Sequence, residues 1–514
     1  MENKFVLSPS RFIVVCSIVL ISMAMVITVW AVTTKLTSSD ISAGDWFGDA
    51  VAVDGTTAVI AAYKDDLSPT ILDTGAAYIF SHNSTNWIED TKLTPSDGAA
   101  EDYFGFCADI DTDTVVIGSL QQDSGAVNGG AAYVYVKNGS VWSEQQKLLA
   151  SDAAVNDYLG YSCAISDNTI TVGAPYEDNA SGSAAGSVYI FTRSGTTWTE
   201  QQKLTAPSGA VNDQFGNSID IDGDTLVVGA RYHGGKGAAY IYTKSGTTWS
   251  LEQKLVASDA ATDDDFGLST AIDGDRVSIS APGNDDTYSN TGSIYIFERS
   301  GTVWSEHVKL TTSDGLPGDY LGIFTIGLSG DYLAAGTPYS DASGSNSGAA
   351  YLFGRVDGVW TELDKIVESD VGANDWFGIA TDIDGEWIFF GAERSNSVYT
   401  DAGSVYAYSI SANLPPRKVV QVSPNGTGVP TSPTLVWRPE LLATTYSVVV
   451  YDETNDTIVF TNSTPYPTTV CTGDNPSTDT CSVQPGISLS TNINYRWLVR
   501  AHNNVGDGPW SSFP

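Results

Sequence analysis

A motif of the form Asp-x-Phe/Leu-Gly recurs at intervals of 51 to 57 residues and constrains this chain more than any other feature of its sequence. Self-similarity at a fixed period indicates a repeat architecture, in which each unit buries its apolar faces against its neighbours. The chain contains seven copies of the unit, whose aromatic or leucine residues are Phe47, Phe104, Leu159, Phe215, Phe266, Leu321 and Phe377.

Each unit is predicted to form four antiparallel strands. The first, such as 218–221, ends at Asp222-Gly223, and Asp-Gly between alternating residues is typical of a two-residue hairpin. The second, such as 226–228, is apolar throughout, as expected of a strand covered on both faces. The third carries an aromatic signature, as at 189–191, and the fourth carries Trp-x4-Lys-Leu, as at 198–204.

Seven units of four strands predict an all-β fold with a seven-bladed β-propeller over residues 33–411. The last unit stops after its third strand near Tyr408, and a Lys-Leu pair stands before the first unit at Lys35-Leu36. We therefore expect an N-terminal strand to complete the last blade, which closes the ring and removes open sheet edges. A solenoid of stacked sheets is the alternative, and the incomplete last unit argues against it.

One unit follows Phe/Leu-Gly with Gly-Ala-Pro, in Leu159-Gly160 with 173–175, and another carries the close variant Ser-Ala-Pro, in Phe266-Gly267 with 280–282. This combination resembles the FG-GAP repeat of the integrin α-chain propeller, which implies a propeller used in extracellular recognition or cell adhesion. The integrin repeat also carries a calcium loop, Asp-x-Asp-x-Asp-Gly-x-x-Asp, in its first hairpin. Here the hairpin at Asp222-Gly223 is too short to surround a cation that prefers roughly six to eight oxygen ligands. We therefore do not transfer the integrin calcium sites.

The N-terminal segment has Lys4 and Arg11 before an uncharged run at 12–32, which is long enough to cross a bilayer at about 1.5 Å per residue. Basic residues before the run predict that the rest of the chain lies outside the cytosol. We interpret 1–32 as a cytoplasmic tail and signal anchor, with a cleaved signal peptide as the alternative because 29–31 matches a cleavage pattern. The protein is thus expected to be a single-pass membrane protein or secreted. Candidate glycosylation sites in Asn-x-Ser/Thr sequons are Asn83, Asn138, Asn179, Asn425, Asn455 and Asn462.

Residues 412–416 are predicted to form a proline-bearing linker, and residues 417–514 a small β-sandwich. The segment Asn503–Ser511 is similar to the last strand region of fibronectin type III domains, which implies a spacer module of that kind. Cys471 and Cys481 flank a polar loop and are predicted to form a disulfide in an oxidising compartment. Cys107 and Cys163 occupy unlike repeat positions, and we interpret them as buried free thiols.

Charge and motifs limit the functional classes. The formal net charge of −37 argues against nucleic acid as a partner, since binding phosphates needs a basic face. The four histidines show no zinc-ligand spacing, and the sequence has no Gly-x-Ser-x-Gly motif, so no enzyme is predicted. A glycan-acting hydrolase or lyase at the channel mouth is the alternative, because 61 acidic residues offer many carboxylate pairs.

The long, irregular loops follow the second and fourth strands, which emerge on one face of a propeller. We predict that this long-loop face binds an extracellular protein or carbohydrate. Tyrosines recur just after the second strand, where they would stack on sugar rings or hold a peptide; packing between blades is the alternative. In the fourth unit the basic segment 231–236 is a candidate anchor for a carboxylate or sulfate, with charge neutralisation as the alternative. The candidate binding residues are Tyr63, Tyr176, Arg231, Tyr232, His233 and Tyr339.

Aspartates recur between the units, for example Asp97 with Asp102 and Asp314 with Asp319. Their recurrence favours a scaffold role in which carboxylates accept turn amide hydrogens, and calcium binding is the alternative. Acidic pairs that occur in single long loops are the better metal candidates: Asp65, Asp66, Asp285 and Asp286. Apart from calcium, no cofactor is expected.

Overall fold

The computed structural model describes residues 34–410, apart from 287, 357 and 397, and a set of segments in the C-terminal part: 421–423, 432–437, 443–452, 457–462, 464–472, 480–486, 489, 495–502 and 511. The predicted signal anchor at 12–32, the linker at 412–416, Asn425 and Asn455 lie outside the described residues. Among the residues described, there is no helix with the length and apolar character needed to cross a membrane.

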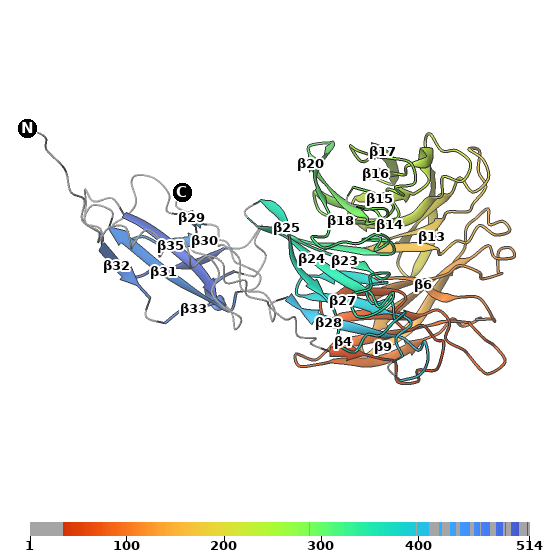
Figure 1. The fold of residues 1–514 in the computed structure, drawn as a ribbon, viewed down its shortest axis with the longest axis horizontal. Helices are drawn as coiled ribbons and strands as arrows, with labels where there is room; N and C mark the ends of the chain where they lie inside the picture. Colours follow the sequence, from red (N-terminus) through yellow and green to blue (C-terminus); the bar gives the residue numbers. More distant parts are fainter. Residues whose placement is uncertain are drawn as a thin grey trace, which may run out of the picture.

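Seven four-stranded antiparallel sheets, called blades 1 to 7, follow one another between Thr34 and Ser409 (Figure 1). Their inner strands are β2 (Val51–Asp54), β6 (Phe104–Asp111), β10 (Ser162–Ser166), β14 (Phe215–Asp222), β18 (Thr270–Asp273), β22 (Ile326–Ser329) and β26 (Thr381–Asp384). Their second strands are β3 (Thr57–Ala62), β7 (Thr114–Ser119), β11 (Thr169–Ala174), β15 (Thr225–Ala230), β19 (Arg276–Ala281), β23 (Tyr332–Thr337) and β27 (Trp387–Ala392).

The third strands are β4 (Ala76–His82), β8 (Ala131–Asn138), β12 (Ser187–Ser194), β16 (Ala238–Ser245), β20 (Ser293–Ser300), β24 (Ala349–Val356) and β28 (Ser404–Ser409). The outer strands are β5 (Trp87–Leu93), β9 (Val141–Leu148), β13 (Thr197–Thr205), β17 (Thr248–Leu255), β21 (Val303–Leu310), β25 (Val359–Ile366) and, for blade 7, β1 (Thr34–Leu36). A short 3-10 helix, η2 (His233–Gly235), interrupts the long loop of blade 4. The long loops gather at one end of the propeller, on the right in Figure 1.

The chain ends of the propeller meet in blade 7. Strand β1 pairs with β28, with Lys35 opposite Tyr406, so the N-terminal strand takes its predicted place. In Figure 1 the red first blade lies beside the light-blue last blade, and Phe47 forms a backbone bridge to Gly403. This arrangement of seven sheets is the seven-bladed propeller that the repeat predicts.

At the hairpin ends of the inner strands, a side chain of each blade accepts a hydrogen bond from a turn amide of the next blade. Asp384 of blade 7, for example, accepts from the Gly55 amide of blade 1 at 2.7 Å. The bonds run around the whole ring, from acceptor to donor: Asp54 to Thr112, Asp111 to Asp167, Ser166 to Gly223, Asp222 to Gly274, Asp273 to Gly330, Ser329 to Gly385 and Asp384 to Gly55.

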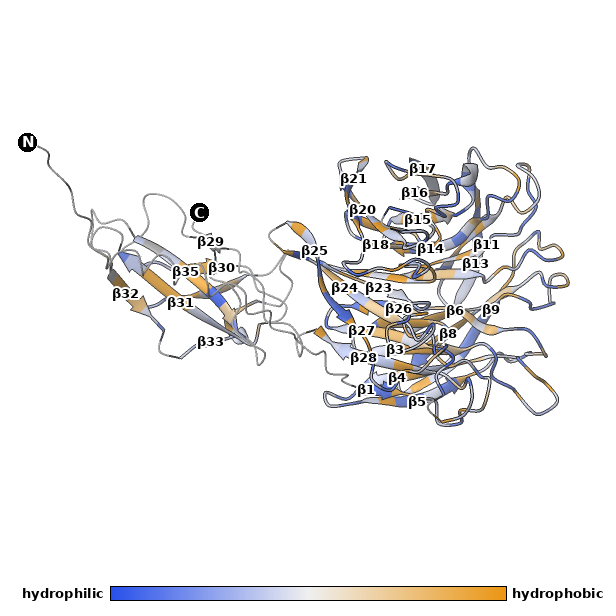
Figure 2. Cartoon of the chain, in the orientation of Figure 1, coloured by the Kyte–Doolittle hydropathy of each residue, from blue (hydrophilic) through white to orange (hydrophobic). Residues whose placement is uncertain are grey.

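The repeated motif builds the core between blades. Phe215 is fully buried in a core that blades 3 and 4 share, and it packs edge-on against Tyr240 of its own blade with ring centroids 5.5 Å apart. The glycine after it allows close approach, since a Cβ on Gly160 would lie 2.4 Å from the Ala131 carbonyl oxygen. Apolar residues gather on the strands and polar residues in the loops (Figure 2). Each motif therefore joins two neighbouring sheets.

The recurring aspartates have the predicted scaffold role. Asp152 accepts hydrogen bonds from the Tyr189 hydroxyl and the Lys203 ammonium group, both at 2.7 Å. The second aspartate caps the turn, as Asp157 does by accepting from the Ala154 amide at 2.7 Å. The first contact recurs at Asp40, Asp97, Asp259, Asp314 and Asp370, and the second at Asp45, Asp102, Asp213, Asp264, Asp319 and Asp375.

Cys107 and Cys163 form a disulfide between blades 2 and 3, with Cα atoms 5.9 Å apart, so the prediction of free thiols is wrong. Alignment of the repeats places Ala108, not Cys107, at the position of Cys163. Adjacent inner strands, however, touch with an offset of one residue. The hydrogen bond from the Ile165 amide to Asp109, at 2.7 Å, shows this offset, since Asp109 is five residues after Phe104 and Ile165 is six residues after Leu159. The disulfide has the same sequence separation of 56 as this hydrogen bond.

The described C-terminal segments form two sheets. One contains β29 (Gln421–Ser423), β30 (Leu435–Trp437) and β34 (Cys481–Val483). The other contains β31 (Thr445–Asp452), β32 (Thr457–Thr461), β33 (Tyr466–Pro467) and β35 (Tyr495–His502), with η3 (Thr468–Val470) after β33. Residues of both sheets, including Trp437 and Trp497, share one core, as in a sandwich. The predicted disulfide between Cys471 and Cys481 is confirmed.

Replacing Cys107 and Cys163 together by alanine should lower the free energy of unfolding of the propeller by about 2–4 kcal/mol, because the cross-link restricts the unfolded chain. Calorimetry under non-reducing conditions measures this as a lower melting temperature. The paired change Cys471→Ala and Cys481→Ala is the control and should leave the propeller transition in place. Free thiols at both propeller positions, found by mass spectrometry of the non-reduced protein, would contradict the assignment.

Candidate ligand site at the channel mouth

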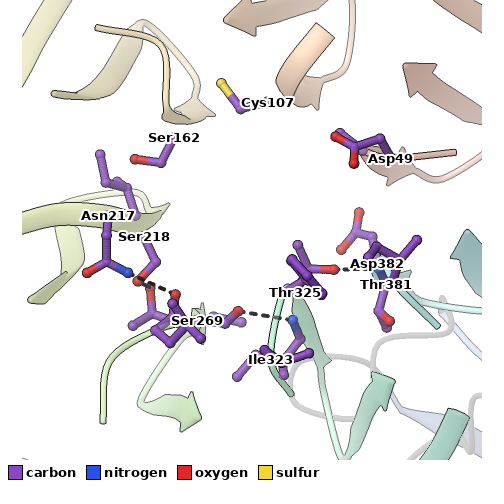
Figure 3. A pocket seen from close by; sticks show the side chains of 18 of the residues that line it. Asp49, Cys107, Ser162, Asn217, Ser218, Ser269, Ile323, Thr325, Thr381 and Asp382 are labelled. Atoms are coloured by element: carbon purple, nitrogen blue, oxygen red, sulfur yellow. Dashed lines mark hydrogen bonds between the residues drawn. The ribbon is translucent and has the colours of Figure 1, made fainter. Parts of the chain in front are cut away.

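The inner strands surround a cavity of about 720 Å³ that extends from the channel to the long-loop face. Figure 3 shows Asp49, Ser162, Asn217, Thr325 and Asp382, from five different blades, around the same space. A cavity of this size is typical of a ligand pocket. Every blade contributes to its wall, so the closed ring creates the site.

The residues that directly follow the motif glycine form one level of the cavity wall. They are Asp49, Phe106, Tyr161, Asn217, Leu268, Ile323 and Ile379 in blades 1 to 7. Because the motif fixes the backbone at this point, the side chains vary without changing the scaffold. Asp49 is the charged member of this level.

Aromatic side chains form a belt around much of the mouth. Tyr63 is central to it, with ring centroids 5.6 Å from Trp46, 5.5 Å from Tyr103 and 5.6 Å from Phe106. The belt continues from Phe106 to Tyr161 at 5.1 Å. The aromatic belt comprises Trp46, Tyr63, Tyr103, Phe106, Tyr158, Tyr161, Tyr176, Tyr320, Tyr339 and Trp376. All ten are half-buried, so each presents part of its ring to solvent.

Five members of the aromatic belt have a left-handed backbone. They occupy the variable position of the Asp-x-Phe/Leu-Gly motif, with φ between 52° and 59°: Trp46, Tyr103, Tyr158, Tyr320 and Trp376. The same position is left-handed in blades 4 and 5, where it holds Gln214 and Asp265. The motif therefore requires the backbone conformation but not an aromatic residue, and bulky residues adopt it at a cost of about 1–2 kcal/mol.

Two cations stack on the tryptophans of the belt. The guanidinium group of Arg394 lies 3.6 Å from the Trp376 ring centroid and 4.7 Å from that of Trp46. The ammonium group of Lys64 lies 3.4 Å from the Trp46 ring centroid. Among the described residues, Lys64 has no carboxylate within ion-pair distance. Its charge is therefore stabilised mainly by the ring.

Two acidic side chains meet beside these cations. Glu393 is only 2% exposed, and Asp49 lies close enough for the two carboxyl groups to interact. Burial, and then the neighbouring Glu393, raise the pKa of Asp49 well above its usual range. Burial and the neighbouring carboxyl group therefore favour the protonated form of Asp49. Burial, followed by the charges of Asp49 and Glu393, also raises the pKa of Tyr63, which keeps its hydroxyl as a donor.

Three more carboxyl groups line the channel below the mouth, at Asp109, Asp220 and Asp382. Burial raises the pKa of Asp220 and of Asp382 to about 7, although each accepts hydrogen bonds from backbone amides. Asp220 binds the Ile272 amide and Asp382 the Val53 amide, both at 2.7 Å. These groups thus connect adjacent blades, and their charged forms are disfavoured in the folded protein.

Of the sequence-predicted binding residues, Tyr63, Tyr176 and Tyr339 lie in the aromatic belt. Arg231 lines the cavity, and its Nε donates to Gln214 at 2.8 Å. Its guanidinium group stacks on Tyr232, whose ring is the more exposed of the two. Arg231 and Tyr232 thus form a separate pair beside the belt.

His233 occupies a place where blade 4 departs from the repeat. Its Nδ1 lies 2.7 Å from Asp213, and its Nε2 lies 2.5 Å from the ammonium group of Lys254. In six blades the corresponding lysine pairs with an inter-blade aspartate, but here Ser208 stands at that position. Burial lowers the pKa of Lys254, although Asp213 opposes the shift. His233 therefore replaces part of the scaffold.

Each of the four metal candidates already has a protein partner. Asp65 is 2.8 Å from the Lys92 ammonium group, and Asp66 accepts the Asp73 amide at 2.9 Å. Asp285 accepts the Asn290 amide at 2.7 Å, and Asp286 pairs with Lys309. Within the described ranges, no cluster of three or more acidic, histidine or cysteine side chains is arranged to hold a metal.

The candidate glycosylation sites differ in their hydrogen bonds. Asn83 and Asn138 are exposed. Asn179 Nδ2 donates to the Gly186 carbonyl at 2.8 Å, and Asn462 Nδ2 donates to the Tyr446 carbonyl at 3.1 Å. Attaching a glycan to either of the last two would replace a donor that the fold uses.

Sequence reasoning missed several residues of the site. They are Trp46, Asp49, Lys64, Tyr103, Tyr158, Tyr320, Trp376, Glu393 and Arg394. A signal for five of them was present, because the variable position of the motif is aromatic in those repeats. The proximity of Asp49 to Glu393 depends on contact between blade 1 and blade 7, which are far apart in the sequence.

A comparison with protein families matches the FG-GAP repeat to seven segments of the chain: residues 30–80, 87–135, 142–191, 198–242, 249–297, 304–353 and 360–408. The matched segments follow the blades and together cover more than half of the chain. No curated protein matches the chain.

Because the pKa of Asp220 is raised in the folded protein, this residue makes the free energy of unfolding depend on pH. The contribution of Asp220 to the free energy of unfolding is fully present below the unfolded pKa near 3.8, where the carboxyl group is protonated in both states. It is lost as the pH rises to about 7, because the folded protein disfavours the charged form.

Asp220→Asn keeps only one of the two oxygens that accept the Ile221 and Ile272 amides, a loss that is the same at every pH. Removing the charge should raise the free energy of unfolding of the variant, relative to the original, by about 1–3 kcal/mol more at pH 8 than near pH 4, a difference that channel water limits. At pH 4, close to the unfolded pKa, most of this pH-dependent gain should be absent. Thermal melts at both pH values measure this, and an equal shift at both would refute it.

Proposed function

Because this chain belongs to the FG-GAP repeat family, we propose that it is an extracellular recognition protein that binds its partner at the channel mouth of the long-loop face. The observation that carries the proposal is the set of five aromatic residues held in a left-handed backbone around the channel-mouth cavity and a second cavity that shares part of its wall. Strained residues of this kind persist where function favours the side chain. Two disulfides support a location in an oxidising compartment.

The segments on either side of the propeller are consistent with a protein that presents its binding face outside the cell. We propose that residues 12–32 anchor the protein in a membrane or direct its secretion, and that the C-terminal sandwich is a fibronectin-type spacer. The seven-bladed ring then provides a rigid platform, since binding residues on loops are positioned by the sheets beneath them.

The aromatic belt can be tested by changing residues that the scaffold does not require. Tyr103→Asn with Tyr158→Asn should leave the free energy of unfolding within about 1 kcal/mol of the original, because asparagine adopts a left-handed backbone at lower cost. Binding of the full chain to cell surfaces, matrix proteins or glycans should weaken at least tenfold. Adhesion of beads that carry the chain measures binding, and thermal melts measure stability.

Thr112→Asn is the matched control, because this residue has the same left-handed backbone, with φ of 53°, in the hairpin turn at the opposite end of the inner strand from the aromatic belt. It should leave binding unchanged. If the tyrosine variant instead loses 2–3 kcal/mol of stability and keeps full binding, the belt serves packing between blades and the proposal fails.

A glycan-acting hydrolase or lyase is the second candidate function, and the Asp49–Glu393 pair favours it. A carboxyl group with a raised pKa beside a second carboxyl group is the pairing used for general acid and base catalysis. Incubation with polysaccharides should then release reducing ends or unsaturated products. Glu393→Gln should lower that turnover at least 100-fold while ligand binding persists. Absence of any product from substrates that the chain binds would leave recognition as the function.

A further inference from the structure

Four large aliphatic side chains stand where blades 1 to 3 meet their neighbours on the long-loop face. At every blade boundary, a carbonyl group of the long loop accepts a hydrogen bond from an amide of the inter-blade loop, as Val127 does from Asn156 at 3.0 Å. The accepting residue is aliphatic in blades 1 and 2, at Leu72 and Val127. In the other five blades it is polar or glycine: Ser183, Gly235, Ser289, Ser345 and Thr400. The residue before the donor is valine at Val155 and Val211, and alanine, threonine or proline elsewhere. Because all seven boundaries make the same backbone contact, the scaffold does not require these four side chains.

The four aliphatic side chains are exposed and border an aromatic cavity. Each is between 48% and 62% exposed. The residues after Leu72 and Val127 hold two tyrosines of the aromatic belt, since their carbonyl groups accept the Tyr103 amide at 3.3 Å and the Tyr158 amide at 3.2 Å. Both tyrosines line a second cavity of about 440 Å³, whose other aromatic walls are Tyr63, Phe106, Tyr161 and Tyr176. The aliphatic side chains and this cavity are together called the blade 1–3 surface. Contiguous exposed apolar surface of this kind indicates an interaction site.

Four exposed carboxylates accompany the blade 1–3 surface. Asp66, Asp123 and Asp178 lie in the long loops of blades 1, 2 and 3, and each accepts an amide of its own loop at 2.8 or 2.9 Å. Glu101 lies beside Leu72, because its amide donates to the Leu72 carbonyl at 3.0 Å. In the part of the chain that the structure describes, none of the four carboxylates has a lysine or arginine within ion-pair distance. Their negative charge is therefore not compensated by a neighbouring cation.

The lysines at this end of the same blades do not offset that charge. Lys92, Lys147 and Lys203 are half-buried, and they pair with other acidic residues at 2.7 to 2.8 Å. Lys64 is half-buried too and lies over the Trp46 ring. The blade 1–3 surface therefore combines apolar side chains with a negative potential, in a chain whose net charge is −37.

We infer, on the premise of the proposed function, that the blade 1–3 surface docks a basic amphipathic polypeptide of the partner protein. Apolar side chains of that polypeptide pack on Leu72, Val127 and Val155 and reach the tyrosines of the second cavity. Its lysine and arginine side chains pair with the four exposed carboxylates, while their aliphatic stems cover the valines. Apolar contact and opposite charge are thus satisfied by one ligand chemistry.

Other occupants complement the surface less well. A second copy of the chain would bring the same carboxylates face to face, and like charges across an interface disfavour association. Anionic membranes, nucleic acids and acidic glycans meet the same repulsion. A neutral glycan would cover the tyrosines but gain nothing from the carboxylates. The charge of the surface therefore selects a cationic partner.

Fluorescence anisotropy of the full chain with three labelled peptides tests the inference at about 0.15 M salt, where attraction between distant exposed charges is largely screened. The peptides are amphipathic helices of about 18 residues. One consists of leucine and lysine, the second has glutamate for every lysine, and the third has serine for every leucine. We expect saturable binding of the leucine–lysine peptide and at least tenfold weaker binding of the other two. Equal binding of the serine–lysine peptide would show attraction by net charge alone and would overturn the inference.

A pair of charge variants locates the docking surface. Asp123→Asn with Asp178→Asn removes two charges but keeps an oxygen for each loop amide, and it should weaken binding of the leucine–lysine peptide at least fivefold. Asp285→Asn with Asp341→Asn is the matched control, because these exposed aspartates accept the same kind of loop amide in blades 5 and 6. The control should change binding less than twofold.

A pair of apolar variants tests the aliphatic part of the surface independently. Val127→Ser with Val155→Ser should also weaken binding of the leucine–lysine peptide at least fivefold, because it removes apolar contact and leaves the charge unchanged. Val141→Ser with Val303→Ser is the control, since these equally exposed valines lie in hairpins between third and outer strands. Thermal melts confirm that each variant is folded.

Four outcomes separate the inference from its premise. Binding of the leucine–lysine peptide that both surface variants weaken and both controls preserve supports the inference and the proposed function. Equal weakening by surface and control variants indicates diffuse attraction and overturns the inference. Absence of peptide binding, or binding of neutral glycans instead, together with cell or matrix adhesion that Tyr103→Asn with Tyr158→Asn abolishes, overturns the inference and keeps the proposed function. Absence of binding to peptides, glycans, cells and matrix proteins removes both.

Discussion

The structure depends on hydrogen bonds between the inner strands of neighbouring blades. In these bonds the donor stands one position further along the repeat than the acceptor. Asp109 to Ile165 and Asp220 to Ile272 are examples from the channel wall, and the hairpin rim repeats the contact around the ring. Each of these acceptors satisfies a backbone amide of the next inner strand, which joins neighbouring blades without a continuous sheet around the channel. The offset brings side chains of adjacent blades together. The Cys107–Cys163 disulfide follows from the same offset.

Periodicity allowed much of the fold to be predicted from the sequence. The strands of the blades, the closing strand at Lys35 and the aspartates Asp97 and Asp102 all correspond to positions that recur in every unit or nearly every unit. A contact that each blade makes requires the same residue type at the same position of each unit, so it can be recognised in the sequence. The Cys107–Cys163 bond could not be predicted because alignment of the units does not reveal how adjacent strands are offset. The pairing of Asp49 with Glu393 occurs once, across the boundary where the two ends of the chain meet, so no periodic signal marks it.

Departures from the repeat concentrate at the channel mouth. In blades 4 and 5 the motif position holds Gln214 and Asp265 in place of an aromatic residue, and blade 4 also replaces the scaffold aspartate with Ser208. Arg231 contacts Gln214, and His233 lies between Asp213 and Lys254. The mouth is therefore asymmetric, aromatic over five blades and polar over two. A sevenfold scaffold thus presents a site that has no sevenfold symmetry.

The same left-handed turn that builds each blade also explains why the site lies where it does. The motif needs a residue with positive φ directly before the buried Phe or Leu, and that residue's side chain faces the mouth in every blade that contributes to the belt. The variable position of the motif therefore serves both the fold and the site. The left-handed backbone there favours glycine or asparagine, whereas an aromatic surface at the mouth requires Trp or Tyr at the same position. Closure of the ring provides the stability that offsets five strained residues. A propeller that lost one inter-blade connection would tolerate fewer of them, which links the strength of the ring to the extent of the aromatic belt.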